Sequence, residues 1–149
     1  FYYVISISIH NDFNKNLLLK QNAIIELCSK ILDSENCNDA KINFILKDKK
    51  FLNTLKKEYF DMDVYTDVIA FNLGDKDTID GEVYISIDDV LENSKLYSKT
   101  FNEEFSRIVI HGLLHLLGYN DKTKKEKDNM TLLEEKYLLL SNIVLISIK

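Results

Sequence analysis

The sequence predicts a single α/β or α+β domain in which a four-stranded mixed sheet packs with about five helices. Three observations lead to this prediction. Segments with alternating apolar residues, as in strands, are interleaved with segments whose apolar residues recur at helical spacing. The chain has 149 residues, enough to bury a core in one domain. It contains no repeat, low-complexity tract or linker, so we expect one domain over residues 1–149.

Four segments are expected to form strands. The residues Tyr3, Ile5, Ile7 and Ile9 alternate with polar ones, which is typical of a half-buried strand. The same alternation predicts strands over 42–46 and 83–87, and the continuous apolar run Val68–Phe71 is expected of a buried strand. The polar residues 72–80 are expected to form a turn region.

Five segments are expected to form helices, on the basis of apolar spacing and of start signals. The spacing predicts helices over 14–33 and 50–60, and Asp88 and Asp89 can cap a short helix that runs to about residue 97. Thr100 and Glu103 have the form of a capping box, as do Thr123 and Glu126. These boxes predict a helix that ends at Gly118 and a final helix that ends near residue 140.

The composition is that of a globular protein rather than of a membrane protein or a nucleic-acid coat. Hydrophobic residues make up 46% of the chain and charged residues 29%, and the net charge is −5, which still allows a local basic patch. No apolar run approaches the roughly 20 residues of a membrane span, and the first residues do not resemble a signal peptide. Cys28 is expected in the core and Cys37 in a loop or at a helix end. Their spacing suits no metal site, which favours a reducing, cytoplasmic location.

The most informative segment is the run from His111 to Asp121. Two histidines four residues apart on a helix project from one face and can hold one metal ion. Gly118 can end the helix in a left-handed conformation, so that the chain turns back and offers Asp121 as a third ligand. Three protein ligands leave an open position, as in catalytic metal sites. The alternative for Asp121 is a cap of the next helix.

One residue argues against a protease. The histidine spacing resembles the zinc helix of metzincin proteases, but a glutamate follows the first histidine there and acts as general base. Here that position is Gly112, which cannot transfer a proton. Glu104 is expected on the surface, with the orientation of a ligand or water as the alternative. His10 is expected at the surface, at the end of the first strand, with a fourth metal ligand as the alternative.

The segment from His111 to Tyr119 resembles the signature of the YbeY family, metal-dependent endoribonucleases that act in ribosomal RNA maturation. Two further segments, Tyr59–Phe71 and Asp80–Ser86, are similar to that family, and Met130 and Glu134 follow the motif as they do in the family. In the first segment the similarity is greatest at Asp63, Thr66, Asp67, Val68 and Phe71. The resemblance covers nearly the whole chain. In most members the motif closes with Asp-His, whereas Asn120 and Asp121 stand at these positions here.

The resemblance implies one divalent metal ion, zinc, held by His111, His115 and Asp121. It also implies cleavage of small-subunit ribosomal RNA and a role in ribosome quality control. The expected partners are ribosomal RNA and proteins of the small ribosomal subunit, with no membrane and no small-molecule cofactor. An arginine that lines the cleft in the family is replaced by Phe60, and Lys56, Lys57 or Arg107 are candidates to substitute for it.

The expected chemistry is metal-assisted cleavage of a phosphodiester, with neutral histidines as ligands. The candidate catalytic residues are His111, His115, Arg107, Thr66 and Asp67. Thr66 and Asp67 have two equally supported interpretations. They line the wall of the cleft, or they only cap the start of a strand through hydrogen bonds. Two interpretations apply to lysines 122, 124, 125 and 127. They are expected either to contact the phosphates of an RNA backbone or to form a solvated helix face. The rival functions are a zincin-like metalloprotease and a non-catalytic ribosome-associated module with a structural metal.

Overall fold

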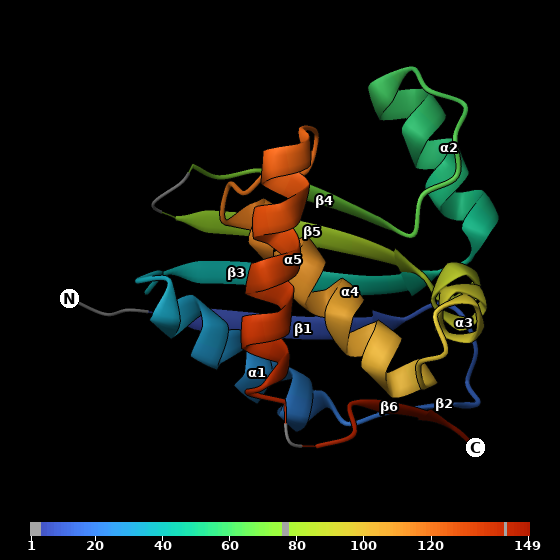
Figure 1. Ribbon diagram of the computed structural model, residues 1–149, viewed down its shortest axis with the longest axis horizontal. Helices are drawn as coiled ribbons and strands as arrows, with labels where there is room; N and C mark the ends of the chain where they lie inside the picture. The colour runs from blue at the N-terminus through green and yellow to red at the C-terminus, as the bar shows by residue number, and fades with distance from the viewer. Residues whose placement is uncertain (1–3, 76–77, 142) are drawn as a thin grey trace.

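A mixed sheet and the helices against one of its faces form the body of the protein in this computed structural model (Figure 1). The structure describes residues 4–75, 78–141 and 143–149. Within them the strands are β1 (Ile5–Asn11), β2 (Leu17–Leu19), β3 (Ala40–Lys47), β4 (Val68–Asn72), β5 (Ile79–Ser86) and β6 (Ile146–Ile148). The helices are α1 (Gln21–Ser34), α2 (Lys49–Phe60), α3 (Ile87–Leu96), α4 (Phe101–Leu116) and α5 (Lys124–Leu138). The predicted fold class, a four-stranded mixed sheet with five helices, is confirmed for these residues.

The main sheet has the strand order β1-β3-β5-β4. The strands β1, β3 and β5 run parallel, and β4 pairs antiparallel with β5 at the edge. Because side chains alternate along a strand, the buried apolar residues of β3 and β5 face one side of the sheet and form the core there. Figure 1 shows α1, α4 and α5 on one side of the sheet, with α2 standing apart beyond the ends of β4 and β5.

Helix α4 lies between the sheet and α5, which explains why it is apolar on most of its surface. It packs on β4 and β5 on one side and on α5 on the other. A helix that is covered on several sides must be apolar on several sides. Gly112 allows the close approach to the sheet, because a Cβ there would lie 2.6 Å from Cγ1 of Val83. Position 112 therefore faces β5.

A second, small sheet was not expected from the sequence. The predicted helix over 14–33 begins only at Gln21, and Leu17–Leu19 forms β2, which pairs antiparallel with β6 near the C-terminus. The prediction was wrong for residues 14–20. The reason is that β2 is too short to show a period, and its partner lies more than 120 residues away in the chain.

Three further details differ from the predictions: the burial of one strand and the starts of two elements. The run Val68–Phe71 was expected to be a buried strand, but β4 is an edge strand in which only Ile69 is fully buried. Strand β5 begins at Ile79, inside the expected turn region. Helix α3 begins at Ile87, because the side chain of Ser86 rather than that of an aspartate caps it. Tyr3, expected in the first strand, lies outside the described residues.

The N-caps of the two C-terminal helices are confirmed, but among the described residues only the second cap forms the predicted reciprocal box. The hydroxyl of Thr100 accepts a hydrogen bond from the Glu103 amide at the start of α4. Thr123 and Glu126 form a complete capping box at the start of α5. Cys28 is buried in the core as expected, and burial raises the pKa of its thiol to about 12. None of the helices in the described parts of the chain has the length and apolar character of a membrane span.

Candidate metal centre

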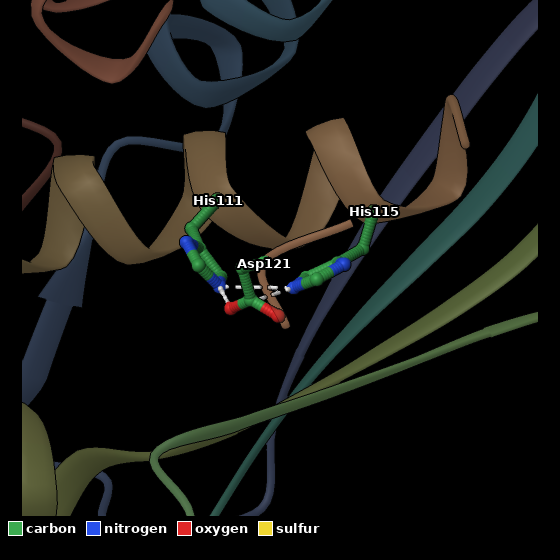
Figure 2. A group of neighbouring side chains, drawn as sticks. All are labelled: His111, His115 and Asp121. Carbon is green, nitrogen blue, oxygen red and sulfur yellow. Dashed lines mark hydrogen bonds and ion pairs between the residues drawn. The ribbon is translucent and has the colours of Figure 1, made fainter. Parts of the chain in front are cut away.

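His111 and His115 lie one turn apart on α4, and their rings point to the same spot. The two Nε2 atoms are 3.0 Å apart. An Asp121 oxygen, Oδ2, lies 3.3 Å from Nε2 of His111 and 3.5 Å from Nε2 of His115. Figure 2 shows the three side chains converging below the helix. Their ligand atoms all lie within 4.8 Å of one another, so the group could hold a metal ion.

The turn after α4 brings Asp121 to the histidines. Gly118 has a φ of +100°, which a residue without a side chain adopts at little cost. The amide of Gly118 donates to the His115 carbonyl and that of Tyr119 to the Leu114 carbonyl, the paired bonds of a Schellman motif. The predicted reversal at Gly118 is therefore confirmed. Thr123, not Asp121, caps α5, so the capping alternative for Asp121 is wrong.

The outer nitrogen of each histidine ring contacts an acceptor. Nδ1 of His115 lies 3.0 Å from the Tyr119 carbonyl, and Nδ1 of His111 lies 3.2 Å from Oε1 of Glu134. A carbonyl or an ionised carboxylate only accepts, so each Nδ1 carries the proton when the rings are neutral. Both Nε2 lone pairs then face the centre, which is how outer contacts commonly orient metal-binding histidines.

A cation fits this donor set. With both Nδ1 atoms protonated, two nitrogen lone pairs and a carboxylate oxygen meet at one place, and none of them can donate to another. Burial and the neighbouring His111 lower the pKa of His115, which favours its neutral, metal-binding form. The side chains are 15%, 27% and 38% exposed for His111, His115 and Asp121, so solvent and ligands can reach the group.

A cluster of carboxylates around Arg107 lies directly behind His111. The Arg107 guanidinium binds Glu104 through Nε at 3.0 Å and Glu134 through Nη1 at 3.0 Å. Burial alone would lower the pKa of Arg107, but the bonds to Glu104 and the nearby carboxylates outweigh it and raise that pKa. Glu104 is only 2% exposed, so the prediction that it lies on the surface was wrong. It is buried because Arg107 neutralises it.

Thr66 and Asp67 lie at the start of β4. The Thr66 hydroxyl donates to the Val68 carbonyl at 3.2 Å, a local contact at the strand start. An Asp67 oxygen is 3.9 Å from Nη2 of Arg107. Burial raises the pKa of Asp67, while the charges of Arg107 and His111 oppose that rise. Asp67 thus belongs to the same group of charges as His111, whereas no contact links Thr66 to the ligands within the described residues.

Other candidates lie away from the centre or in ordinary contacts. His10 is exposed and contacts Asn43, as expected of a strand-end surface residue. Lys57 pairs with Asp63, and the Lys56 ammonium lies 4.5 Å from the ring centre of Phe60. The four lysines that follow Asp121, at positions 122, 124, 125 and 127, are all exposed or nearly so, and Lys124 pairs with Asp128.

Sequence reasoning missed the contact between Glu134 and His111. Glu134 is 5% exposed and lies on the buried stripe of α5 with Met130 and Tyr137, at spacings of four and three residues. A carboxylate on an apolar stripe needs a partner, because burying an unpaired charge is costly. The place of Glu134 on this apolar stripe was therefore the sequence signal that it has a buried partner. The carbonyl of Tyr119, by contrast, carries no side-chain signature.

Fold and site together define an α/β protein with a solvent-accessible His-His-Asp centre on one helix and the turn that follows it. The family model described as Endoribonuclease YbeY matches residues 8–142. The chain belongs to the YbeY family, as its motifs suggested.

Relatives with curated names agree with this assignment. The chain is 35% identical over 133 residues to Endoribonuclease YbeY of Christiangramia forsetii, covering 89% of this chain and 91% of that protein. It is 39% identical over 122 residues to Endoribonuclease YbeY of Amoebophilus asiaticus, covering 81% and 83%. The solution structure of TM1509 from Thermotoga maritima is similar with a TM-score of 0.59 at 29% identity, over 89% of this chain and 86% of that one.

Proposed function

We propose that this chain is a metal-dependent endoribonuclease that acts in the cytoplasm on small-subunit ribosomal RNA, in its maturation and in ribosome quality control. The observation that carries the proposal is the convergence of His111, His115 and Asp121, within a chain of the YbeY family. The names of the relatives support cleavage of RNA. We propose ribosomal RNA as substrate and proteins of the small subunit as partners.

We propose zinc as the ion, because two imidazoles and one carboxylate are a ligand set that zinc accepts. When bound, the ion would polarise a phosphoryl oxygen and make a water more acidic. His111 and His115 would hold it as neutral rings through Nε2, with their Nδ1 protons directed at Glu134 and at the Tyr119 carbonyl. Asp121 contributes the negative charge.

Three further residues are proposed to line the approach to the ligands: Arg107, Thr66 and Asp67. Arg107 is already bound by Glu104 and Glu134, so its proposed role is to hold the Glu134 carboxylate beside the His111 ring. The raised pKa of Asp67 suits a carboxyl that takes up and releases a proton. The half-buried Thr66 offers a hydroxyl at the end of the loop before β4.

A protease reaction lacks its usual base. A glutamate at position 112 would point at β5, since a Cβ there would already lie 2.6 Å from Val83. The carboxylate of Glu134, on α5, is buried and bound to Arg107 and His111. This geometry argues against peptide hydrolysis by the glutamate mechanism of the H-E-x-x-H enzymes.

The test is cleavage of small-subunit ribosomal RNA by metal-free, zinc-loaded and chelator-treated protein. We expect cleavage only with metal, and cleavage by His111→Ala that is slower by a factor on the order of 100 or more. His10→Ala, which changes an exposed histidine on β1, is the matched control and should cleave at the wild-type rate. Metal-loaded wild type that leaves the RNA intact would contradict the proposal and favour a non-catalytic module. Cleavage of an unfolded protein, abolished in His111→Ala, would favour the protease.

A further inference from the structure

An aromatic and basic surface lies on a different part of the molecule from the metal ligands. Its rings form a continuous series of contacts. Phe71 lies 5.6 Å from Tyr59, 5.8 Å from Phe60 and 6.0 Å from Tyr84, measured between ring centres. Tyr84 in turn lies 5.8 Å from Phe51. We call this set of rings the aromatic surface.

The outer rings of this surface are open to solvent. Tyr59 is 66% exposed and Phe60 41%. A pocket of about 230 Å³ lies beside them, lined by Leu55, Tyr59, Phe71, Leu73, Glu82 and Tyr84. Contiguous exposed apolar groups of this kind mark interaction sites. The surface is built by α2, which carries Phe51, Tyr59 and Phe60, and by the side of β4 and β5 that faces away from α4.

Lysines surround the rings, although the protein as a whole is acidic. From β3 to the end of α2, residues 40–60, the chain has six lysines and two acidic residues, a net charge of +4, against −5 for the whole chain. The ammonium groups of Lys47 and Lys56 lie 4.4 Å and 4.5 Å from the ring centres of Phe51 and Phe60. Lys47 pairs with Asp12 at 3.2 Å and Lys57 with Asp63 at 3.5 Å, whereas Lys56 forms no ion pair with any described residue. The positive charge is therefore partly available to a partner.

We propose that this surface binds single-stranded RNA, with unpaired bases stacked on Tyr59 and Phe60 and the backbone phosphates near Lys56. Stacking on aromatic rings together with a basic groove is the usual basis of single-strand binding. A second copy of the chain is a poor occupant, because two copies of this segment would bring like charges together. A stem is also a poor occupant, because its bases are not free to stack. The lysines at the start of α5 have no such rings among them.

The inference rests on the proposed function only in its choice of RNA, and its test needs no catalysis. The probe is a fluorescein-labelled single-stranded RNA of about 12 nucleotides, a length that such grooves cover. Its binding is measured by anisotropy with metal-free protein, so that no RNA is cleaved. The binding result is therefore independent of the cleavage assay, and a failure to cleave RNA would not change it.

Tyr59→Ala and Phe60→Ala should each weaken binding about tenfold, a typical loss for one stacked base. Both residues are exposed, so the variants should keep the wild-type melting temperature. Tyr97→Ala is the matched control, since Tyr97 is a 56% exposed tyrosine outside this surface. Lys56→Ala should lower the slope of log affinity against log salt by about 1.

Three results of the binding assay would overturn the proposal, and a fourth would come from sedimentation. The first is wild-type protein that does not bind the probe, and the second is a Tyr59→Ala/Phe60→Ala variant that binds it as well as wild type. The third is equal binding of a fully paired RNA stem with the same dependence on the two rings. Sedimentation of both proteins tests for a second copy: dimers of wild type that dissociate in the double variant would identify the surface as a protein interface instead.

Discussion

The proposed metal ligands and the charge cluster behind them lie side by side but are encoded in different ways. The ligands His111, His115 and Asp121 come from eleven consecutive residues. The cluster joins Asp67 before β4, Glu104 and Arg107 on α4, and Glu134 on α5. The comparison shows that a short segment can bring three candidate ligand atoms together, while Glu134 from a distant segment contacts the His111 ring from behind.

The two groups also differ in what their loss should cost. The ligands are partly exposed, and the loop that carries Asp121 is held by its own turn. The acidic members of the cluster on α4 and α5 are almost fully buried and depend on one arginine. Substitutions of His111, His115 or Asp121 should therefore reduce metal binding with little loss of stability. Substitution of Arg107 should mainly reduce the stability of the fold.

The largest effect on folding is expected from Arg107→Ala. It leaves two buried carboxylates, Glu104 and Glu134, without their cation, and breaking a buried pair in this way costs about 3–5 kcal/mol. Urea denaturation of the metal-free protein measures the loss. Lys124→Ala, which breaks an exposed pair with Asp128, should cost less than about 1 kcal/mol. If both variants lose the same small free energy of unfolding, the charge cluster around Arg107 does not stabilise the fold as proposed.

The next effect concerns the contact between the two groups. Glu134→Gln keeps the size of the side chain but replaces a carboxylate acceptor of His111 Nδ1 by a weaker amide. Loss of such an outer contact typically reduces metal affinity by roughly 10- to 100-fold. Competition with a chromophoric chelator measures the affinity for zinc. Glu135→Gln, next to it on the exposed side of α5, is the control. Equal affinities for the two variants would show that Glu134 does not orient the ligand.

The same comparison explains what could be predicted from the sequence. The convergence of His111, His115 and Asp121, the turn at Gly118 and the caps at Thr100 and Thr123 follow from local spacing, and the structure shows each of them. The burial of Glu104 could not be predicted, because its partner on the same helix could equally have pointed to solvent. The pairing of β2 with β6 was missed for a related reason, since neither strand is recognisable without the other.

A smaller effect is expected from pH. Burial and His111 lower the pKa of His115 in the folded chain below its ordinary value near 6.5. Between those two values the unfolded chain binds more protons, so the metal-free protein should lose stability as the pH falls through about 6.5, and the loss should stop below the folded pKa. Urea midpoints from about pH 8 to about pH 5 test this. The slope should be shallower in His115→Gln, and an identical slope would contradict the assignment.

The smallest effect is expected at the turn. Gly118 has a φ of +100°, and a Cβ at this position would have no atom within 4 Å, so Gly118→Ala meets backbone strain but no clash. Such strain costs about 1–2 kcal/mol, which lowers the melting temperature by several degrees for a chain of this size. Zinc affinity should also fall, because the turn positions Asp121. A wild-type melting temperature and affinity would mean that the turn tolerates a side chain.

The most direct test of the central claim, that His111, His115 and Asp121 hold one ion, is a calorimetric titration of metal-free protein with zinc. Wild type should bind one ion per chain, His111→Ala should show no binding at this site, and Asp121→Ala should bind more weakly while its melting temperature stays within a few degrees of wild type. Wild type that binds no zinc, or variants that bind it with unchanged affinity, would contradict the claim.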